Sequence, residues 1–265
     1  LTPVPGGVGA VTTAVLALQV AEAAAQQEEA RGKDCRLKIG IFIDTYFPMI
    51  DGVIMAVDNY AKYLTQYADV TVFTTVVNRD FEDDSPYRIV RCLSLPLRSE
   101  DYVVPAPELD LEFWNELMRS DLDLVHIHSP FTVGMAGKRY AKRHGIPMVA
   151  TMHSQFQVDF RRTLKMEPLV KLAMEEIMKV FNSADEVWVP NAHAAEVFKE
   201  YGGESEPLVR GNATDLRPVQ DPEASKKRIN ALCGLGDEEK VLLFVGRLVL
   251  QKNIMFIADA AAELK

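Results

Sequence analysis

The chain has 265 residues, of which 48% are hydrophobic and 25% charged, and its formal net charge is −9 at pH 7. This composition allows one large or two smaller globular domains. The negative charge argues against a general nucleic-acid binder, which needs a basic surface to neutralise phosphates. The three cysteines are widely spaced and form no CxxC pair, which is typical of a reducing cytosol and indicates no metal site. We therefore expect a cytoplasmic globular protein that uses no metal or other cofactor and binds no nucleic acid.

The first residues differ in composition from the rest. Residues 1–27 include the apolar stretch Val11–Ala25, which is too short and too polar to span a bilayer, and no basic region of a secretory signal precedes it. Residues 28–36 are polar and predict a linker. Because the chain starts at Leu1 and stops at Lys265 within an apolar helical pattern, we expect it to be a fragment.

From residue 37 on, strand and helix patterns alternate. Short apolar runs predict strands, and an apolar stripe of helical period predicts helices. The predicted strands are 37–43, 68–75, 87–92, 123–129, 147–153 and 186–190, and the predicted helices are 52–67, 107–120, 132–144, 168–182 and 192–201. Strands that are apolar on both sides and joined by helices indicate a parallel sheet with helices on both faces, a Rossmann-like α/β fold.

A second domain is predicted after a loop-rich stretch, Gly202–Pro222. The first domain is assigned to residues 37–205 and the second to residues 206–265. Helix 223–233, strand 240–246 and helix 254–264 are predicted in the second domain. This order matches the beginning of another Rossmann-like unit.

Ligands of parallel sheets bind beyond the carboxyl ends of the strands, where the strand order reverses. The first strand leads into a loop at whose end Asp51 and Gly52 open a helix. Gly52 allows a ligand to approach the backbone, and the N–H groups at the start of the helix are expected to be free to bind a phosphate. An ordinary βα turn is the alternative interpretation. The loop is neither a GxGxxG fingerprint nor a P-loop.

Histidines follow two other strands. His128 ends one strand and His153 ends the next, so both are placed to contact a ligand at the edge of the sheet. His126 is two residues before His128 and is expected on the same face. The alternative for each is a hydrogen-bonded core histidine. A zinc site is disfavoured because no third ligand has suitable spacing.

The segment Val245–Asn253 is the most specific stretch of the sequence. A strand ends at Gly246, and Arg247 and Lys252 lie before the next helix. A glycine, a guanidinium group and an ammonium group in this order are suited to clamp a diphosphate, whereas two solvated surface cations are the alternative.

These motifs, in this order, resemble those of the family 4 retaining glycosyltransferases. The resemblance covers residues 37–265 and is found in YFPxxDGV, HIHSPFxxG, ATMHS, VPNxxAAE and GRLxxQKN. It implies two Rossmann-like domains of the B-type glycosyltransferase fold, with the active cleft between them. It also implies transfer of a hexose from a UDP- or GDP-sugar donor with retention of configuration.

The resemblance assigns roles on the donor side of the cleft. Gly52 would approach the nucleotide-sugar, and Arg247 and Lys252 would stabilise the leaving diphosphate. Negative charge grows on that phosphate oxygen during transfer, so preorganised cations favour the reaction.

For the rest of the cleft, the resemblance implies that His128 is the catalytic residue near the sugar or acceptor. Asp51, His153 and Asn191 would line the cleft. Two departures stand out: Asp51-Gly52 replaces the usual glycine pair, as in lipid-modifying members, and Arg210-Gly211-Asn212 transposes the usual order at the domain crossing. A pair of donor-binding glutamates would lie after residue 265, so we expect this fragment to be inactive.

The acceptor is predicted to be a membrane lipid such as diacylglycerol, with a sugar or small molecule as the alternative. Val158–Phe181 carries several Arg and Lys residues beside apolar ones, a composition that can lie on an anionic membrane. Glutamates dilute this charge, and a helix packed on the sheet would look similar. The segment suggests peripheral contact with the inner face of the cell membrane.

Residues 2–24 are similar to the C-terminal tail of bifunctional methylenetetrahydrofolate dehydrogenase/cyclohydrolases, with PVPGGVG as the shared motif. A glycine-rich turn before an amphipathic helix is the alternative. The tail suggests a fusion, natural or from gene prediction. Two other functions therefore stay open: a folate enzyme, if the parent chain extends upstream, and a non-catalytic nucleotide-sugar binder.

Overall fold

The structure, a computed structural model, describes residues 36–76, 81–96, 103–212, 218–236, 239, 241–246 and 252–263. The folate-enzyme-like tail, nearly all of the linker and Arg247 lie outside these residues. The chain separates into two compact units, Leu1–Leu216 and Arg217–Lys265. Each unit is described by itself.

The described part of the first unit contains a seven-stranded sheet in which every neighbouring pair is parallel. The strand order is β3-β2-β1-β6-β7-β8-β9. The strands are β1 (Leu37–Phe42), β2 (Ala68–Thr75), β3 (Arg88–Cys92), β6 (Leu124–Ile127), β7 (Met148–Thr151), β8 (Glu186–Val189) and β9 (Leu208–Val209). This confirms the predicted parallel sheet, and the short β9 carries it past the boundary expected between residues 205 and 206.

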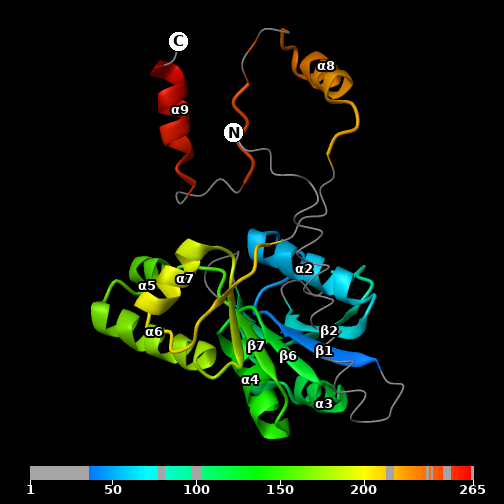
Figure 1. Cartoon of the computed structure of the whole chain (residues 1–265), viewed down its shortest axis with the longest axis vertical. Helices are drawn as coiled ribbons and strands as arrows, with labels where there is room; N and C mark the ends of the chain where they lie inside the picture. Colours follow the sequence, from blue (N-terminus) through cyan, green and yellow to red (C-terminus); the bar gives the residue numbers. More distant parts are fainter. Residues whose placement is uncertain are drawn as a thin grey trace. The chain divides into compact units, whose positions relative to one another are not determined.

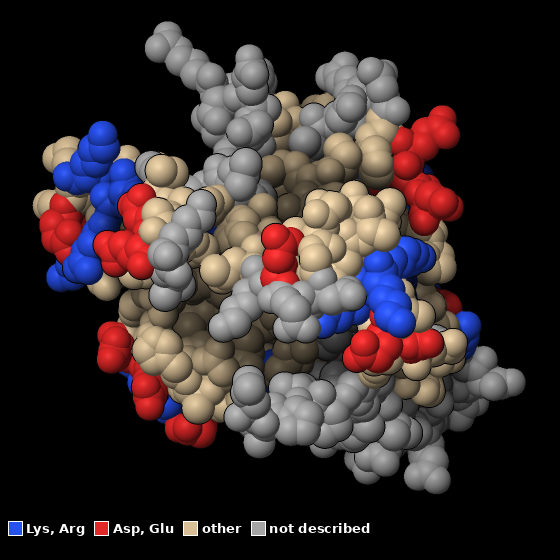
Figure 2. All heavy atoms as spheres, turned by 90° about the horizontal axis from the view of Figure 1, so that it is seen from above, with Lys and Arg blue, Asp and Glu red and all other residues tan. Residues whose placement is uncertain are grey.

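Helices cover both faces of this sheet (Figure 1). They are α2 (Gly52–Leu64), α3 (Leu111–Arg119), α4 (Thr132–His144), α5 (Phe156–Leu164), α6 (Glu167–Phe181) and α7 (Ala192–Glu200). Lys and Arg side chains on the face in Figure 2 stand beside Asp and Glu rather than forming a uniformly basic surface.

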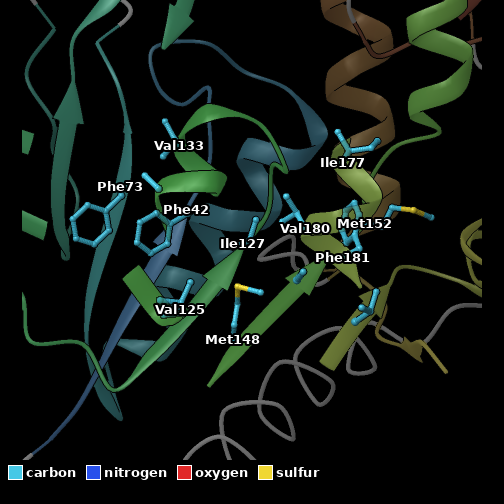
Figure 3. Close-up of a cluster of buried hydrophobic side chains, with 14 of the residues drawn as sticks. Phe42, Phe73, Val125, Ile127, Val133, Met148, Met152, Ile177, Val180 and Phe181 are labelled. Atoms are coloured by element: carbon cyan, nitrogen blue, oxygen red, sulfur yellow. The ribbon is translucent and has the colours of Figure 1, made fainter. Parts of the chain in front are cut away.

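Two hydrophobic cores result from the alternation of side chains along the strands. On one face, Ile39 and Ile41 of β1 pack with Val57 of α2. On the other, Phe42 of β1 stacks on Phe73 of β2, with ring centroids 4.7 Å apart. Figure 3 shows this second core between the strands and the helices α4 and α6. A sheet buried on both faces explains why its strands are apolar throughout.

Several local elements differ from the sequence expectation. The helix predicted over 107–120 is divided into a 3-10 turn, η1 (Pro107–Leu109), and α3, because the Asp110 side chain accepts a hydrogen bond from Phe113 N and starts a new helix. A small antiparallel pair, β4 (Ser94–Pro96) and β5 (Val103–Pro105), and α5 were not predicted.

The second unit contains α8 (Pro222–Cys233) and α9 (Ile254–Glu263). The predicted strand over 240–246 is wrong for the residues that the structure describes there, since 241–246 have no strand conformation. Leu243 and Val245 are 81% and 84% exposed. A strand needs a hydrogen-bonded neighbour, and no other strand occurs among the described residues of this unit.

Candidate functional site

The strand order reverses between β1 and β6. From β1 the chain continues to β2 and β3 on one side, and then returns to β6 and proceeds outward to β9. In sheets of this kind, the loops after the two central strands leave in opposite directions and open a crevice at the carboxyl edge. The β1–α2 loop and the residues after β6 therefore form the candidate site.

Two histidines at this edge are in direct contact. Nδ1 of His128 and Nε2 of His153 are 2.8 Å apart, and the two rings are stacked with centroids 5.1 Å apart. The backbone N–H of His128 donates to Phe42 O at 2.8 Å, which ties the end of β6 to the end of β1. The structure thus brings together the two histidines that the sequence placed at neighbouring strand ends, while their chemical roles stay predictions.

His126 lies beside this pair. Its Nε2 is 2.8 Å from Oγ1 of Thr151, and its ring centroid is 4.0 Å from that of His128 and 4.9 Å from that of Trp188. The shared face of His126 and His128 follows from their spacing by two residues along a strand. Tyr60 of α2 closes the group, with its ring centroid 5.8 Å from that of His128.

Burial keeps the histidines neutral. Desolvation lowers the pKa of His126 to about 3 and that of His153 to about 4, although the charge of Asp51 raises the latter. Desolvation, followed by the neighbouring His126 and His153, holds the pKa of His128 well below its usual range. At neutral pH each ring therefore carries a single proton. Nε2 of His128 is buried and has no hydrogen-bond partner among the described residues.

The loop before α2 differs from the expectation in one respect. Asp51 is the N-cap residue, and its Oδ1 accepts hydrogen bonds from the N–H groups of Val53 and Ile54, both at 2.9 Å. These two groups were predicted to be free for a phosphate, and that prediction is wrong because a carboxylate of the chain already occupies them. A Cβ built on Gly52 would meet no atom within 4 Å, so space lies in front of this residue.

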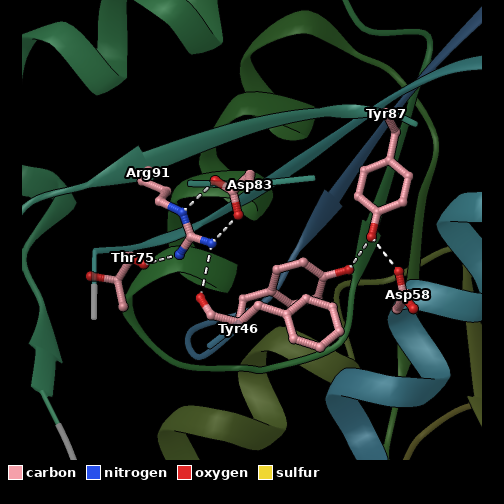
Figure 4. Close-up of polar contacts among 7 residues, drawn as sticks. Tyr46, Asp58, Thr75, Asp83, Tyr87 and Arg91 are labelled. Atoms are coloured by element: carbon pink, nitrogen blue, oxygen red, sulfur yellow. Dashed lines mark hydrogen bonds and ion pairs between the residues drawn. The ribbon is translucent and has the colours of Figure 1, made fainter. Parts of the chain in front are cut away.

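Side chains from α2 and β3 hold the β1–α2 loop in place (Figure 4). Tyr87 donates to Oδ1 of Asp58 at 2.6 Å and accepts from the Tyr46 hydroxyl at 2.6 Å. Burial raises the pKa of both tyrosines, so they remain protonated donors. Arg91 donates to Phe47 O and to Thr75 O, each at 2.9 Å.

No pattern in the sequence predicted this loop network. Tyr87 follows Asp58 by 29 positions, and Arg91 follows Phe47 by 44. No local spacing rule connects residues so far apart. Only the pairing of β2 with β1 and β3 brings them together.

Asp44 is another residue near the site that the sequence patterns did not identify. It follows β1, is 6% exposed, and accepts from Thr132 Oγ1 at 3.0 Å and Val133 N at 2.9 Å. Desolvation raises its pKa to about 6, against the lowering effect of these hydrogen bonds. Asp44 therefore caps α4, whose own N-cap residue, Phe131, has no side-chain cap. The available signal was a carboxylate placed directly after a buried strand.

The remaining predicted site residues lie elsewhere. Asn191 follows β8 and caps α7, accepting from Ala194 N at 2.9 Å. Lys252 is exposed and belongs to the second unit. The predicted pairing of Lys252 with Arg247 falls outside the described residues.

The described residues form neither a metal-binding cluster nor a helix that could span a membrane. Within the described ranges, no three His, Cys, Asp or Glu side chains are grouped as a metal ion would require. None of the helices described has the length and apolar character needed to cross a bilayer.

Comparison with curated proteins gives glycosyltransferases. Alpha-monoglucosyldiacylglycerol synthases of Streptococcus pneumoniae (strain ATCC BAA-255 / R6) and Acholeplasma laidlawii are 24% and 25% identical over 236 and 248 residues. A GDP-mannose-dependent alpha-mannosyltransferase of Corynebacterium glutamicum is 22% identical over 245 residues. Each match covers 86% of this chain, and the chain spans 53%, 60% and 55% of these relatives, respectively.

Two solved structures with a related fold are a sucrose-phosphate synthase and a protein in complex with UDP-glucose. Sucrose-phosphate synthase from Thermosynechococcus elongatus has a TM-score of 0.67 at 17% identity, over 86% of this chain and 60% of that one. Anabaena HepE in complex with UDP-glucose has a TM-score of 0.52 at 12% identity, over 75% of this chain and 50% of that one. At these identities the likeness shows the fold. Residues 50–215, more than half of the chain, match the model of Glycosyltransferase Family 4, and the chain therefore belongs to that family.

Proposed function

We propose that this chain is part of a retaining glycosyltransferase that transfers a hexose from a UDP- or GDP-sugar to a membrane lipid such as diacylglycerol. The observation that carries the proposal is the arrangement at the strand-order reversal. There the partly buried His128–His153 pair and the open space before Gly52 belong to neighbouring loops at one edge. The named activities of the curated relatives support the nucleotide-sugar donor and, for two of them, the glycolipid product.

In this proposal His128 contacts the transferred sugar or the acceptor, and Gly52 lies against the donor. Asp51, His153 and Asn191 form the surrounding wall. Arg247 and Lys252 stabilise the leaving diphosphate, which gains negative charge as the bond to the anomeric carbon breaks. No metal or other cofactor takes part.

Donor binding by the first unit can be tested by nuclear magnetic resonance titration of the ¹⁵N-labelled chain with UDP-glucose and GDP-mannose. We expect shift changes at the amides of residues 52–54 and 128. Gly52→Val should abolish them without unfolding the protein, because the added side chain enters open space. His193→Gln, which changes an exposed histidine, is the matched control and should behave as the wild type. Shift changes that persist in Gly52→Val would contradict the proposed donor site.

The chain by itself is proposed to lack turnover, because it spans only 53–60% of the length of the curated relatives that it matches. Incubating the purified chain with radiolabelled UDP-glucose or GDP-mannose and diacylglycerol vesicles should give no labelled lipid. Measurable transfer would overturn this part of the proposal.

Contact with the inner face of the cell membrane is proposed for the segment Val158–Phe181. The segment includes most of α5 and all of α6. Met174 and Ile177 of α6 are buried in the core, whereas Leu169 and Leu172 are 43% and 56% exposed. Exposed apolar side chains beside basic ones favour the surface of an anionic bilayer. However, Glu167 binds Arg161 at 2.7 Å, so part of the positive charge is compensated.

The membrane proposal is tested by sedimentation with vesicles. The wild type should sediment with phosphatidylglycerol vesicles and less with phosphatidylcholine vesicles. Leu169→Ser combined with Leu172→Ser should reduce sedimentation, whereas Leu232→Ser, at an exposed leucine of α8, should not. Equal sedimentation of all three proteins would refute the assignment of this surface.

The resemblance of residues 2–24 to folate dehydrogenase/cyclohydrolases stays a prediction. These residues lie outside the described part of the chain. A non-catalytic nucleotide-sugar binder remains the alternative function. Such a protein would bind the nucleotide-sugar in the titration, but its full-length form would give no product in the transfer experiment.

A further inference from the structure

The hydrogen bond between His128 and His153 joins two neutral rings. Nδ1 of His128 and Nε2 of His153 are 2.8 Å apart, so one nitrogen carries the proton and the other accepts it. Since a neutral imidazole has one N–H, the direction of this bond also decides which atom of each ring is protonated on the far side. Two proton arrangements are therefore available.

The arrangements differ at the buried Nε2 of His128. If His128 donates through Nδ1, its Nε2 is a bare acceptor. If His153 donates instead, Nε2 of His128 carries a hydrogen, and this N–H faces no acceptor among the described residues. Buried N–H groups without a partner are rarer and costlier than lone pairs without one. The first arrangement is therefore favoured.

Among the residues that the structure describes, the groups packed around the pair do not supply another acceptor. Nε2 of His126 is hydrogen-bonded to Thr151, and the ring centroid of His126 is 4.0 Å from that of His128. The ring centroid of Tyr60, on α2, is 5.8 Å from that of His128. The charge of Asp51 acts on His153, the outer ring of the pair. His153 is also less buried than His128, so the outer ring can exchange protons more readily than the inner one.

We propose that His153 is a positioning residue that fixes the tautomer of His128, so that Nε2 of His128 accepts a hydrogen bond from a hydroxyl group of the ligand. The proposal deepens the proposed function, on which it rests for the identity of the ligand as a sugar. A phosphodiester or diphosphate oxygen without a proton offers no hydrogen to this nitrogen. His128 would therefore recognise the sugar part of the nucleotide-sugar or a hydroxyl of the acceptor, and not the phosphate groups.

The proposal is tested on the ligand-free, full 265-residue chain by long-range ¹H–¹⁵N correlation of ¹⁵N-histidine, which separates protonated from bare ring nitrogens. The chain has five histidines, and His128 is assigned by the signal that His128→Gln removes. At pH 7 we expect Nδ1 of His128 to be protonated and Nε2 to be bare. A protonated Nε2 in the wild type would overturn the proposal.

Variants of His153 separate a positioning role from a packing role. His153→Gln keeps an acceptor for Nδ1–H and should retain the wild-type pattern, whereas His153→Phe keeps a ring but removes the acceptor and should lose it. His193→Gln is the control and should leave the His128 signals unchanged. If His153→Phe retains a protonated Nδ1 and a bare Nε2, His153 does not fix the tautomer.

A ligand titration keeps this test distinct from that of the proposed function. Binding of UDP-glucose through a hydroxyl should shift the Nε2 signal of His128 while leaving that nitrogen bare, and UDP should have a smaller effect. Protonation of Nε2 on adding UDP would instead indicate a phosphate contact and refute hydroxyl recognition. If neither probe binds, the proposed function is weakened, whereas the tautomer is still decided by the ligand-free spectrum.

Discussion

Asp44 and Asp51 stand at the two ends of the β1–α2 loop, and each caps a helix. Asp51 caps α2, whose first residue follows it directly, whereas Asp44 caps α4, which follows the neighbouring strand β6. The environments differ, since the buried Asp44 carboxyl has a pKa raised to about 6. One loop thus fixes the starts of two helices on either side of the candidate site.

Asp44→Ala should lower the free energy of unfolding at pH 7 by about 2 kcal/mol, because it leaves the buried N–H of Val133 without a partner. Asp44→Asn keeps an acceptor for this group and should cost less. Urea denaturation followed by circular dichroism measures both. Equal stability of the alanine variant and the wild type would show that the cap contributes nothing.

Two glycines near the site are expected to respond differently to the same substitution. A Cβ at Gly134 would overlap the backbone carbonyl of Ser129, while one at Gly52 meets open space. Gly134→Ala should therefore destabilise the protein by about 1–3 kcal/mol, and Gly52→Ala should stay within about 0.5 kcal/mol of the wild type. Thermal unfolding of the pair is the measurement, and similar melting temperatures would contradict the packing described.

At the scale of elements, the β1–α2 loop depends on β3 and α2 rather than on its own sequence. Tyr87→Phe removes the hydroxyl that joins Tyr46 to Asp58, and should cost about 1–3 kcal/mol because buried oxygens lose their partner. Tyr67→Phe, at a tyrosine 39% exposed, is the control and should be nearly neutral. A loss of the same size in both variants would argue against the network.

The elements also show what a sequence can predict. β2 and α4 occupy their predicted residues, since strong apolar patterns and, at the end of α4, the left-handed Gly145 define them locally. The short β9 was missed because two residues form no pattern, and only pairing with β8 makes them a strand. The strand expected over 240–246 failed for the opposite reason, since its clear apolar pattern has no neighbouring strand among the described residues of the second unit.

The whole molecule should be less stable in mild acid. The pKa values of His126, His128 and His153 are lowered in the folded state, so the unfolded chain binds more protons as the pH falls below about 6.5. The raised pKa of Asp44 acts in the opposite direction between about 6 and 3.8. Because the three histidines outweigh Asp44, the free energy of unfolding should fall as the pH falls.

We expect the free energy of unfolding to fall between pH 7 and 5, by about 1.4 kcal/mol per pH unit for each net proton taken up on unfolding. Urea denaturation at a series of pH values measures this slope. His126→Asn should make the slope shallower, and His193→Gln should leave it unchanged. A flat profile for the wild type would show that the three rings are not buried neutral.

At this largest scale, the sequence predicted which residues lie at the carboxyl edge of the sheet, but not the contacts that they make there. His128, His153 and Gly52 were located because the strand-end rule needs only the order of elements. The occupied helix start, the role of Asp44 and the loop network depend on side chains that meet through folding across long separations. These could not be read from spacing alone.

The position of the site within the sheet has a consequence for its motion. β1 and β6, which lead into it, are the third and fourth strands of the described seven-stranded sheet and are buried by both cores. Amide hydrogens of such central strands exchange with solvent only when the whole domain opens. The floor of the candidate site should therefore be the slowest-exchanging part of the first unit, while the loops at its rim should exchange faster.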